Sequence, residues 1–140
     1  MGISAVEKWG RVSAAMGVAV VSAVLAAGCA GVLPEPDPAP VVAERAQARW
    51  TALIDGDLKK AYGFVSPTSR QTYTWEVYRG AVRPGFWKTA KVDKVACPAK
   101  DLCEVDLTIE YAQRGTVIRT PLRESWTRQD GEWWYVLKTL

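Results

Sequence analysis

The residue types that carry most protein chemistry are sparse in this chain of 140 residues, which has three cysteines and no histidine. Without histidine, the chain lacks the usual general base, the usual zinc ligand and any serine–histidine or cysteine–histidine pair. No glycine-rich phosphate-binding loop is found either. The sequence therefore predicts no metal site and no cofactor, and the cysteines are the first residues to consider.

Cys29 ends a segment that has the plan of a signal peptide. Lys8 and Arg11 precede an uncharged run, residues 12–27, which is shorter than the roughly 20 apolar residues of a comfortable membrane span. The run leads into LAAGC, which resembles the bacterial lipobox. We expect residues 1–28 to be a lipoprotein signal peptide and Cys29 to become the lipidated N-terminus.

A lipid anchor also predicts a location. Ala30 follows Cys29, and by resemblance to lipoproteins of two-membrane bacteria this position lacks the Asp that retains them at the inner membrane. We expect a protein of the bacterial cell envelope, anchored in the outer membrane and facing the periplasm. Its expected partners are the membrane, through the lipid, and an envelope protein or a second copy of the chain.

Residues 29–41 are predicted to form a proline-rich tether. Proline occupies every second position from 34 to 40, which disfavours a helix and favours extended polyproline II. At about 3.1 Å per residue, the tether would hold the domain at 42–140 roughly 30 Å from the lipid.

Cys97 and Cys103 remain once Cys29 is assigned to the lipid. As a hairpin loop, residues 98–102 would set these two cysteines opposite each other. Since a signal peptide implies an oxidising compartment, we expect a disulfide that stabilises the fold by about 2 kcal/mol. A redox-active pair is less favoured, because the spacing is not that of a CxxC motif.

The remaining composition is that of a small aromatic-rich domain. The net charge of +3 comes from scattered residues and is too small to favour nucleic acid. Seven Trp and five Tyr can either fill a core or line a pocket. The candidates for these two roles are Trp50, Tyr111, Trp126 and Tyr135.

Glu124 is the carboxylate to consider for catalysis, because the predicted strand pairing turns it inward beside Trp126. It is only a weak candidate for a catalytic base. The plainer interpretation is an inward charge paired with a basic residue such as Arg123 or Arg128.

An antiparallel meander is the firmest structural prediction. Residues 105–111 alternate apolar and polar types. Asp130–Gly131 suits a two-residue hairpin loop, which would pair Trp126 with Tyr135, Arg128 with Trp133 and Glu124 with Leu137. A turn at residues 112–115 would pair Tyr111 with Thr116, Ile109 with Ile118 and Val105 with Leu122. Both registers place the apolar rows on one face.

The elements before the meander are predicted to be mainly helical. Val42, Ala46, Trp50 and Leu53 have helical spacing, with Gly56 as the C-terminal cap. Further helices are expected from Asp57 to Tyr62 and from Ser66–Pro67 to about Gly80. The first strand begins near Lys88 and pairs Val95 with Val105. Pro121 requires either a bulge in its strand or a position at a sheet edge.

Helices followed by a strongly curved antiparallel sheet form an α+β plan that resembles the nuclear transport factor two superfamily, the cone-shaped fold shared with ketosteroid isomerase. The likeness rests on residues 46–67, 104–128 and 130–137. That family includes enzymes, ligand binders and assembly subunits, so the fold alone does not decide function. Its isomerases use a pocket Asp, and no Asp here has a matching context.

Two functions follow as hypotheses. The first is a non-catalytic envelope lipoprotein whose domain binds a protein partner or a small apolar ligand. Trp134 and Val136 favour a partner, because they lie on the strand face opposite Trp133 and Tyr135 and leave that strand apolar on both sides. The alternative is a small isomerase- or dehydratase-like enzyme that uses Glu124 in the cone.

Overall fold

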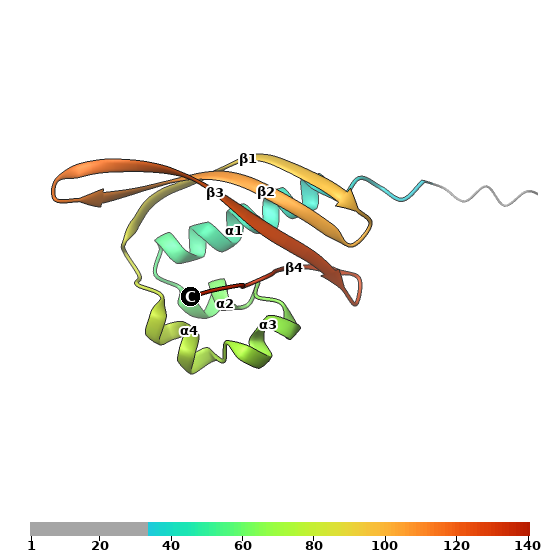
Figure 1. The fold of residues 1–140 in the computed structure, drawn as a ribbon, viewed down its shortest axis with the longest axis horizontal. Coiled ribbons are helices and arrows are strands. Elements are labelled where there is room, and N and C mark those ends of the chain that lie inside the picture. Colours follow the sequence, from blue (N-terminus) through green and yellow to red (C-terminus); the bar gives the residue numbers. More distant parts are fainter. Residues whose placement is uncertain (1–33) are drawn as a thin grey trace, which may run out of the picture. The chain divides into compact units, whose positions relative to one another are not determined.

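The computed structural model describes residues 34–140, of which Glu35–Leu140 form one compact unit. The predicted signal peptide and Cys29 lie outside the described residues. Within them, four helices precede a four-stranded antiparallel sheet of order β1-β2-β3-β4 (Figure 1). The curved sheet and the helices form the expected α+β fold. None of the described helices is long and apolar enough to cross a membrane.

Helix α1 (Ala39–Ile54) begins three residues earlier than the predicted start at Val42. Pro38 is its N-cap and Pro40 lies in its first turn, where a missing backbone N–H costs nothing. The prediction of an extended tether is therefore wrong for residues 39–41. Gly56 follows the helix with φ of +80°, the left-handed conformation expected of a C-terminal glycine.

Three short helices follow: α2 (Leu58–Tyr62), α3 (Pro67–Thr72) and α4 (Trp75–Ala81). The predicted caps are present, since the Asp57 carboxylate accepts a hydrogen bond from Lys60 N at 3.0 Å and Ser66 Oγ accepts one from Ser69 N at 3.1 Å. The single helix expected from Ser66 to about Gly80 is two helices instead. The chain leaves the helical conformation at Tyr73, and Thr74 caps the second helix.

The C-terminal hairpin has the predicted register. Strands β3 (Thr116–Gln129) and β4 (Glu132–Tyr135) pair Trp126 with Tyr135 and Arg128 with Trp133. Asp130 and Gly131 both have positive φ, +51° and +81°, as a type I′ turn requires. Because β4 ends at Tyr135, the predicted pair of Glu124 and Leu137 is not part of the ladder.

The register predicted between β2 (Leu102–Gln113) and β3 is wrong by two residues. The turn is a two-residue loop at Arg114 and Gly115, with φ of +49° and +79°, instead of the four residues expected. Tyr111 therefore pairs with Ile118, and Val105 pairs with Glu124. A shift of two residues keeps every side chain on its own face, so the predicted apolar face is still correct.

Strand β1 (Trp87–Ala99) pairs with β2 and places Val95 opposite Val105, as predicted. Cys97 and Cys103 form the expected disulfide. The loop between them is shorter than expected, because Ala99 already pairs with Leu102 after an irregularity in the register.

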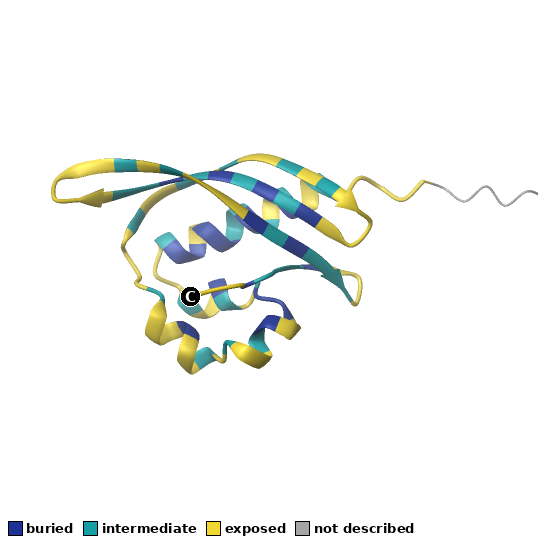
Figure 2. Ribbon diagram, viewed as in Figure 1, coloured by how far each residue is buried: buried dark blue, intermediate teal, exposed yellow. Residues whose placement is uncertain are grey.

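The core lies between α1 and the concave face of the sheet. Figure 2 shows buried residues alternating along β2, and these are Cys103, Val105, Leu107 and Ile109. Helix α1 contributes Val42, Ala46, Trp50 and Leu53 from its facing side. Trp126 of β3 is fully buried among these residues.

Two stretches along the edges of the sheet differ. At β1, the Gln47 side chain of α1 accepts a hydrogen bond from Val92 N at 3.1 Å and donates one to Ala90 O at 2.9 Å, as a neighbouring strand would. At β3, residues 116–125 precede the part that pairs with β4 and so form an edge. Pro121 lies there in regular register with Thr108, so its strand needs no bulge.

Candidate functional site: a buried ion pair and an open groove

Glu124 is buried on the concave face of the sheet, with 3% of its surface exposed. Its Oε1 accepts hydrogen bonds from Arg49 Nη1 at 2.6 Å and from Trp50 Nε1 at 2.8 Å. Its Oε2 accepts one from Trp126 Nε1 at 3.2 Å. Two consecutive residues of α1 and one residue of β3 thus neutralise and solvate the carboxylate in place of water.

The prediction that Glu124 faces inward is confirmed, but the predicted ion-pair partners are wrong. Arg123 points to the other face of the sheet and pairs with Asp106, while Arg128 pairs with Glu35. Arg49 is the actual partner. Its spacing of three residues from Ala46 and four from Leu53 is the signal that could have placed it on the buried side of α1.

Arg49 is itself only 5% exposed. Its guanidinium carbon lies 3.7 Å from the centre of the Tyr135 ring, so cation–π attraction adds to the ion pair. Burial opposes its charged form, yet Glu124, with Tyr135 and Tyr78, holds the pKa of Arg49 above its ordinary value. For Tyr78 and Tyr135, burial favours the neutral phenol and so raises the pKa of each hydroxyl.

This cluster is poorly suited to general-base catalysis. A base needs a lone pair within reach of a substrate proton, and both oxygens of Glu124 are engaged by donors inside the core. Glu124 lines neither of the two hollows described below. The geometry is that of a structural ion pair that ties α1 to β3.

The four aromatic candidates do not form one site. Trp50, Trp126 and Tyr135 surround the ion pair, and the rings of Trp126 and Tyr135 lie 6.0 Å apart. Tyr111 lies further along β2, stacked on Phe86 at 4.8 Å between ring centres. The first three are core residues, not the lining of an open pocket.

Trp134 is not the open aromatic surface expected of a strand that is apolar on both faces. It is half-buried, with the guanidinium carbons of Arg45 and Arg70 at 5.5 and 5.6 Å from its ring. Trp134 Nε1 donates to Gln129 O at 3.2 Å. Side chains from α1 and α3 thus cover this ring.

One open hollow lies where the chain enters α1. This groove, of about 550 Å³, is bounded by residues 35–41, by the β1–β2 turn with its disulfide, and by the β3–β4 hairpin. Its apolar walls are built from Pro36, Pro38, Val41, Cys97, Pro98, Ala99 and Trp133. Sequence reasoning missed it because three distant segments form it.

Charged residues stand at one side of the groove. The Glu35 carboxylate forms a hydrogen bond with Arg128 Nη1 and lies 3.6 Å from Lys100 Nζ. The hydrogen bond from Arg128, followed by attraction to Lys100, holds the pKa of Glu35 below its usual value. Asp37 also lines the groove, and its Oδ1 accepts a hydrogen bond from Ala39 N at 3.0 Å.

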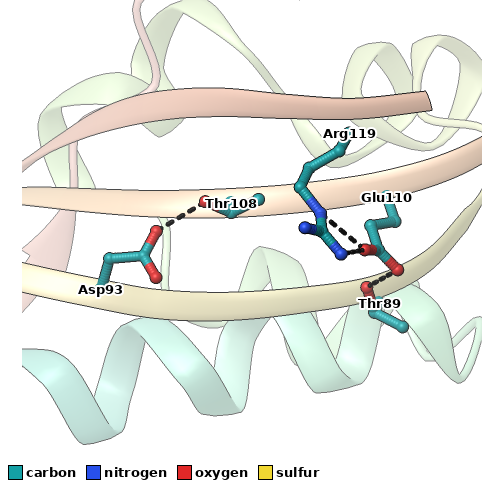
Figure 3. A network of polar contacts seen from close by, with 5 residues as sticks. All are labelled: Thr89, Asp93, Thr108, Glu110 and Arg119. Atoms are coloured by element: carbon teal, nitrogen blue, oxygen red, sulfur yellow. Dashed lines mark hydrogen bonds and ion pairs between the residues drawn. The ribbon is translucent and has the colours of Figure 1, made fainter.

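The convex face of the sheet is polar instead. Arg119 donates twice to Glu110 Oε1, at 2.8 and 2.6 Å, and Thr89 donates to Oε2 of the same carboxylate at 2.9 Å (Figure 3). Thr108 donates to Asp93 Oδ2 at 2.6 Å further along. A second, shallow hollow of about 390 Å³ lies near Pro121 and Leu122. Its lining includes three charged residues, Asp93, Asp106 and Arg123.

Comparison with known proteins supports the fold and no more. No family model matches the chain, and no curated protein matches it. The solution structure of a SEC-C motif containing protein from Rhodopseudomonas palustris is similar, with 14% identity, a TM-score of 0.54 and coverage of 66% of this chain and 73% of that one. A crystal structure from Campylobacter jejuni, described as an NTF2-like transpeptidase, is similar at 12% identity and a TM-score of 0.50, over 68% of this chain and 96% of that one. The chain therefore has the expected fold, that of nuclear transport factor two (an NTF2-like fold).

Proposed function

We propose that this protein is a non-catalytic lipoprotein of the bacterial envelope whose domain binds a small, largely apolar ligand in the groove at the start of α1. The observation that carries the proposal is the burial of Glu124 and the engagement of both its oxygens, which together accept three hydrogen bonds inside the core. The enzyme alternative needs Glu124 as a base that can reach a substrate, and these hydrogen bonds give it a structural role instead.

The groove supports the binding half of the proposal. Its volume of about 550 Å³ lies within the range of about 300–1,000 Å³ that is usual for small-molecule sites. Apolar walls with a few charged groups at one side are also typical of such sites. A protein partner is less favoured, because Trp134, the ring expected to meet it, is covered by Arg45 and Arg70.

Binding is tested with Nile red, a neutral apolar dye, added to the full-length protein in phospholipid nanodiscs, with empty nanodiscs as the blank. We expect saturable fluorescence that the groove-filling variant Ala99→Trp removes. Val117→Trp is the matched control, because Val117 is 66% exposed and does not line the groove. Equal dye binding in both variants would contradict the proposed site.

The anchoring half rests on the sequence LAAGC and the proline-rich segment after it. Replacement of Cys29 with Ser is expected to leave an uncleaved precursor that incorporates no labelled palmitate. Fractionation of the wild-type cells is expected to recover the lipoprotein with the outer membrane. Palmitate labelling of the Cys29→Ser variant would refute the anchor, and recovery with the inner membrane would refute the location.

A further inference from the structure

Two carboxylates line the groove, those of Glu35 and Asp37, and Glu35 is the one that pairs with cations. It comes from the chain just before α1 and lies between two cations, Arg128 of β3 and Lys100 of the β1–β2 turn. Among residues 34–140, Glu35 is the only ion-pair partner of either cation within 4 Å. The folded sheet therefore presents two positive charges, and the single carboxylate of Glu35, from another segment, balances one of them.

The cations and the apolar walls are adjacent. Arg128 lies directly opposite Trp133 in the β3–β4 ladder, at the separation where cross-strand side chains interact. Trp133 lines the groove together with Pro98 and Ala99, which precede Lys100 in the chain. The site thus combines a place for a carboxylate with an apolar surface beside it.

We propose that the groove binds small amphiphilic carboxylates, with the carboxylate head on Arg128 and Lys100 in place of Glu35 and the apolar chain against the walls. This inference rests on the proposed function, because it assumes that the groove is the binding site. A dianionic head such as phosphate fits less well, because Asp37 adds a negative charge to the same lining.

Glu35 then acts as a competitor built into the chain. Because it is tethered next to its cations, a free carboxylate must displace a group held at high effective concentration. The pair is exposed, with side-chain exposure of 32% for Arg128 and 48% for Glu35, so the competition is modest. Neutralising Glu35 is expected to tighten ligand binding by about two- to fivefold.

The test uses octanoate labelled with ¹³C at the carboxyl group, titrated by NMR into the full-length protein in nanodiscs, with empty nanodiscs as the blank. We expect Glu35→Gln to lower the Kd by about two- to fivefold. Arg128→Gln and, separately, Lys100→Gln should each raise it by about two- to fivefold. Arg119→Gln is the matched control, since Arg119 pairs with Glu110 on the convex face and its loss should leave the Kd unchanged.

Several results would overturn the inference. Octanoate affinity that is unaffected by Glu35→Gln, Arg128→Gln and Lys100→Gln would show that the cations do not hold the head. Octyl phosphate that binds more tightly than octanoate would refute the carboxylate class. If octan-1-ol and Nile red still compete for the groove in either case, the proposed function stands. If no apolar probe binds there, the proposed function fails together with the inference.

Discussion

Both faces of the sheet carry arginine–carboxylate ion pairs, but the pair on the concave face is buried and the pairs on the convex face are exposed. On the concave side, Arg49 and Glu124 are each at most 5% exposed and are surrounded by aromatic rings. On the convex side, Arg119 pairs with Glu110 and Arg123 with Asp106 between directly opposite positions of β2 and β3, in contact with water. Breaking a pair is costly where water cannot replace the lost partner and nearly free where it can.

The largest expected effect is on the buried side. Glu124→Ala leaves Arg49 charged and without its carboxylate in the core, which typically costs about 3–5 kcal/mol of unfolding free energy. Urea denaturation followed by tryptophan fluorescence measures this loss. A loss below about 1 kcal/mol would mean that water reaches Arg49, and that the buried and exposed pairs do not differ as argued.

Trp126→Ala is expected to cost nearly as much. Its ring is completely buried and its Nε1 donates to Glu124, so truncation leaves a cavity and an unsatisfied oxygen, together about 3–5 kcal/mol. The same denaturation experiment applies, with Trp9→Ala as a control that should be silent if residues 1–28 are removed. A near-normal midpoint combined with loss of Nile red binding would instead place Trp126 in a ligand pocket.

Replacing both charges should be milder than removing one. Arg49→Met with Glu124→Leu exchanges a buried ion pair for apolar groups, which is often neutral or stabilising in other proteins. Since the hydrogen bonds from Trp50 and Trp126 are also lost, we expect a net cost of about 1–3 kcal/mol. A double variant as unstable as the sum of the Arg49→Met and Glu124→Leu single variants would mean that the two charges do not interact.

The smallest effect is expected on the convex face. Arg119→Ala should leave the denaturation midpoint almost unchanged at neutral pH. Hydrogen bonds from Arg119 to Glu110 and from Arg123 to Asp106 hold the pKa of each carboxyl below its ordinary value. The stabilisation by these two ion pairs is therefore present above the pKa values of the carboxyls in the unfolded chain, about 4. It is lost as the pH falls through their lower pKa values in the folded protein. Midpoints measured from pH 6 to pH 2 should show a loss that is smaller in Arg119→Ala and in high salt. A loss of equal size in the wild type and in Arg119→Ala would contradict this assignment.

Signals that act within a few residues predict most of the fold. The ion pair and the groove are harder to predict, because segments distant in sequence form them. Asp130–Gly131 set the last hairpin, and Asp57 and Ser66 marked helix starts, because each acts within a few residues. The β2–β3 turn was misplaced because Arg114 gives no sign of the positive φ that it adopts. Helical spacing could have placed Arg49 on the buried side of α1, but its pairing with Glu124 and the groove both depend on contacts between segments that local patterns do not relate.

The distance in sequence between Arg49 and Glu124 predicts that their contact forms late in folding. The two residues are 75 positions apart, so their contact closes a long loop, whereas the hairpin turns at Arg114–Gly115 and Asp130–Gly131 close over two residues. Hairpins of this kind form within microseconds, and contacts between distant segments form later. In any partly folded state whose hairpins have formed before α1 docks, Glu124 would be a hydrated charge on the apolar face of the sheet, where it would oppose stacking of one chain on another. The carboxylate that holds α1 in the native structure would thus also oppose aggregation of such a state.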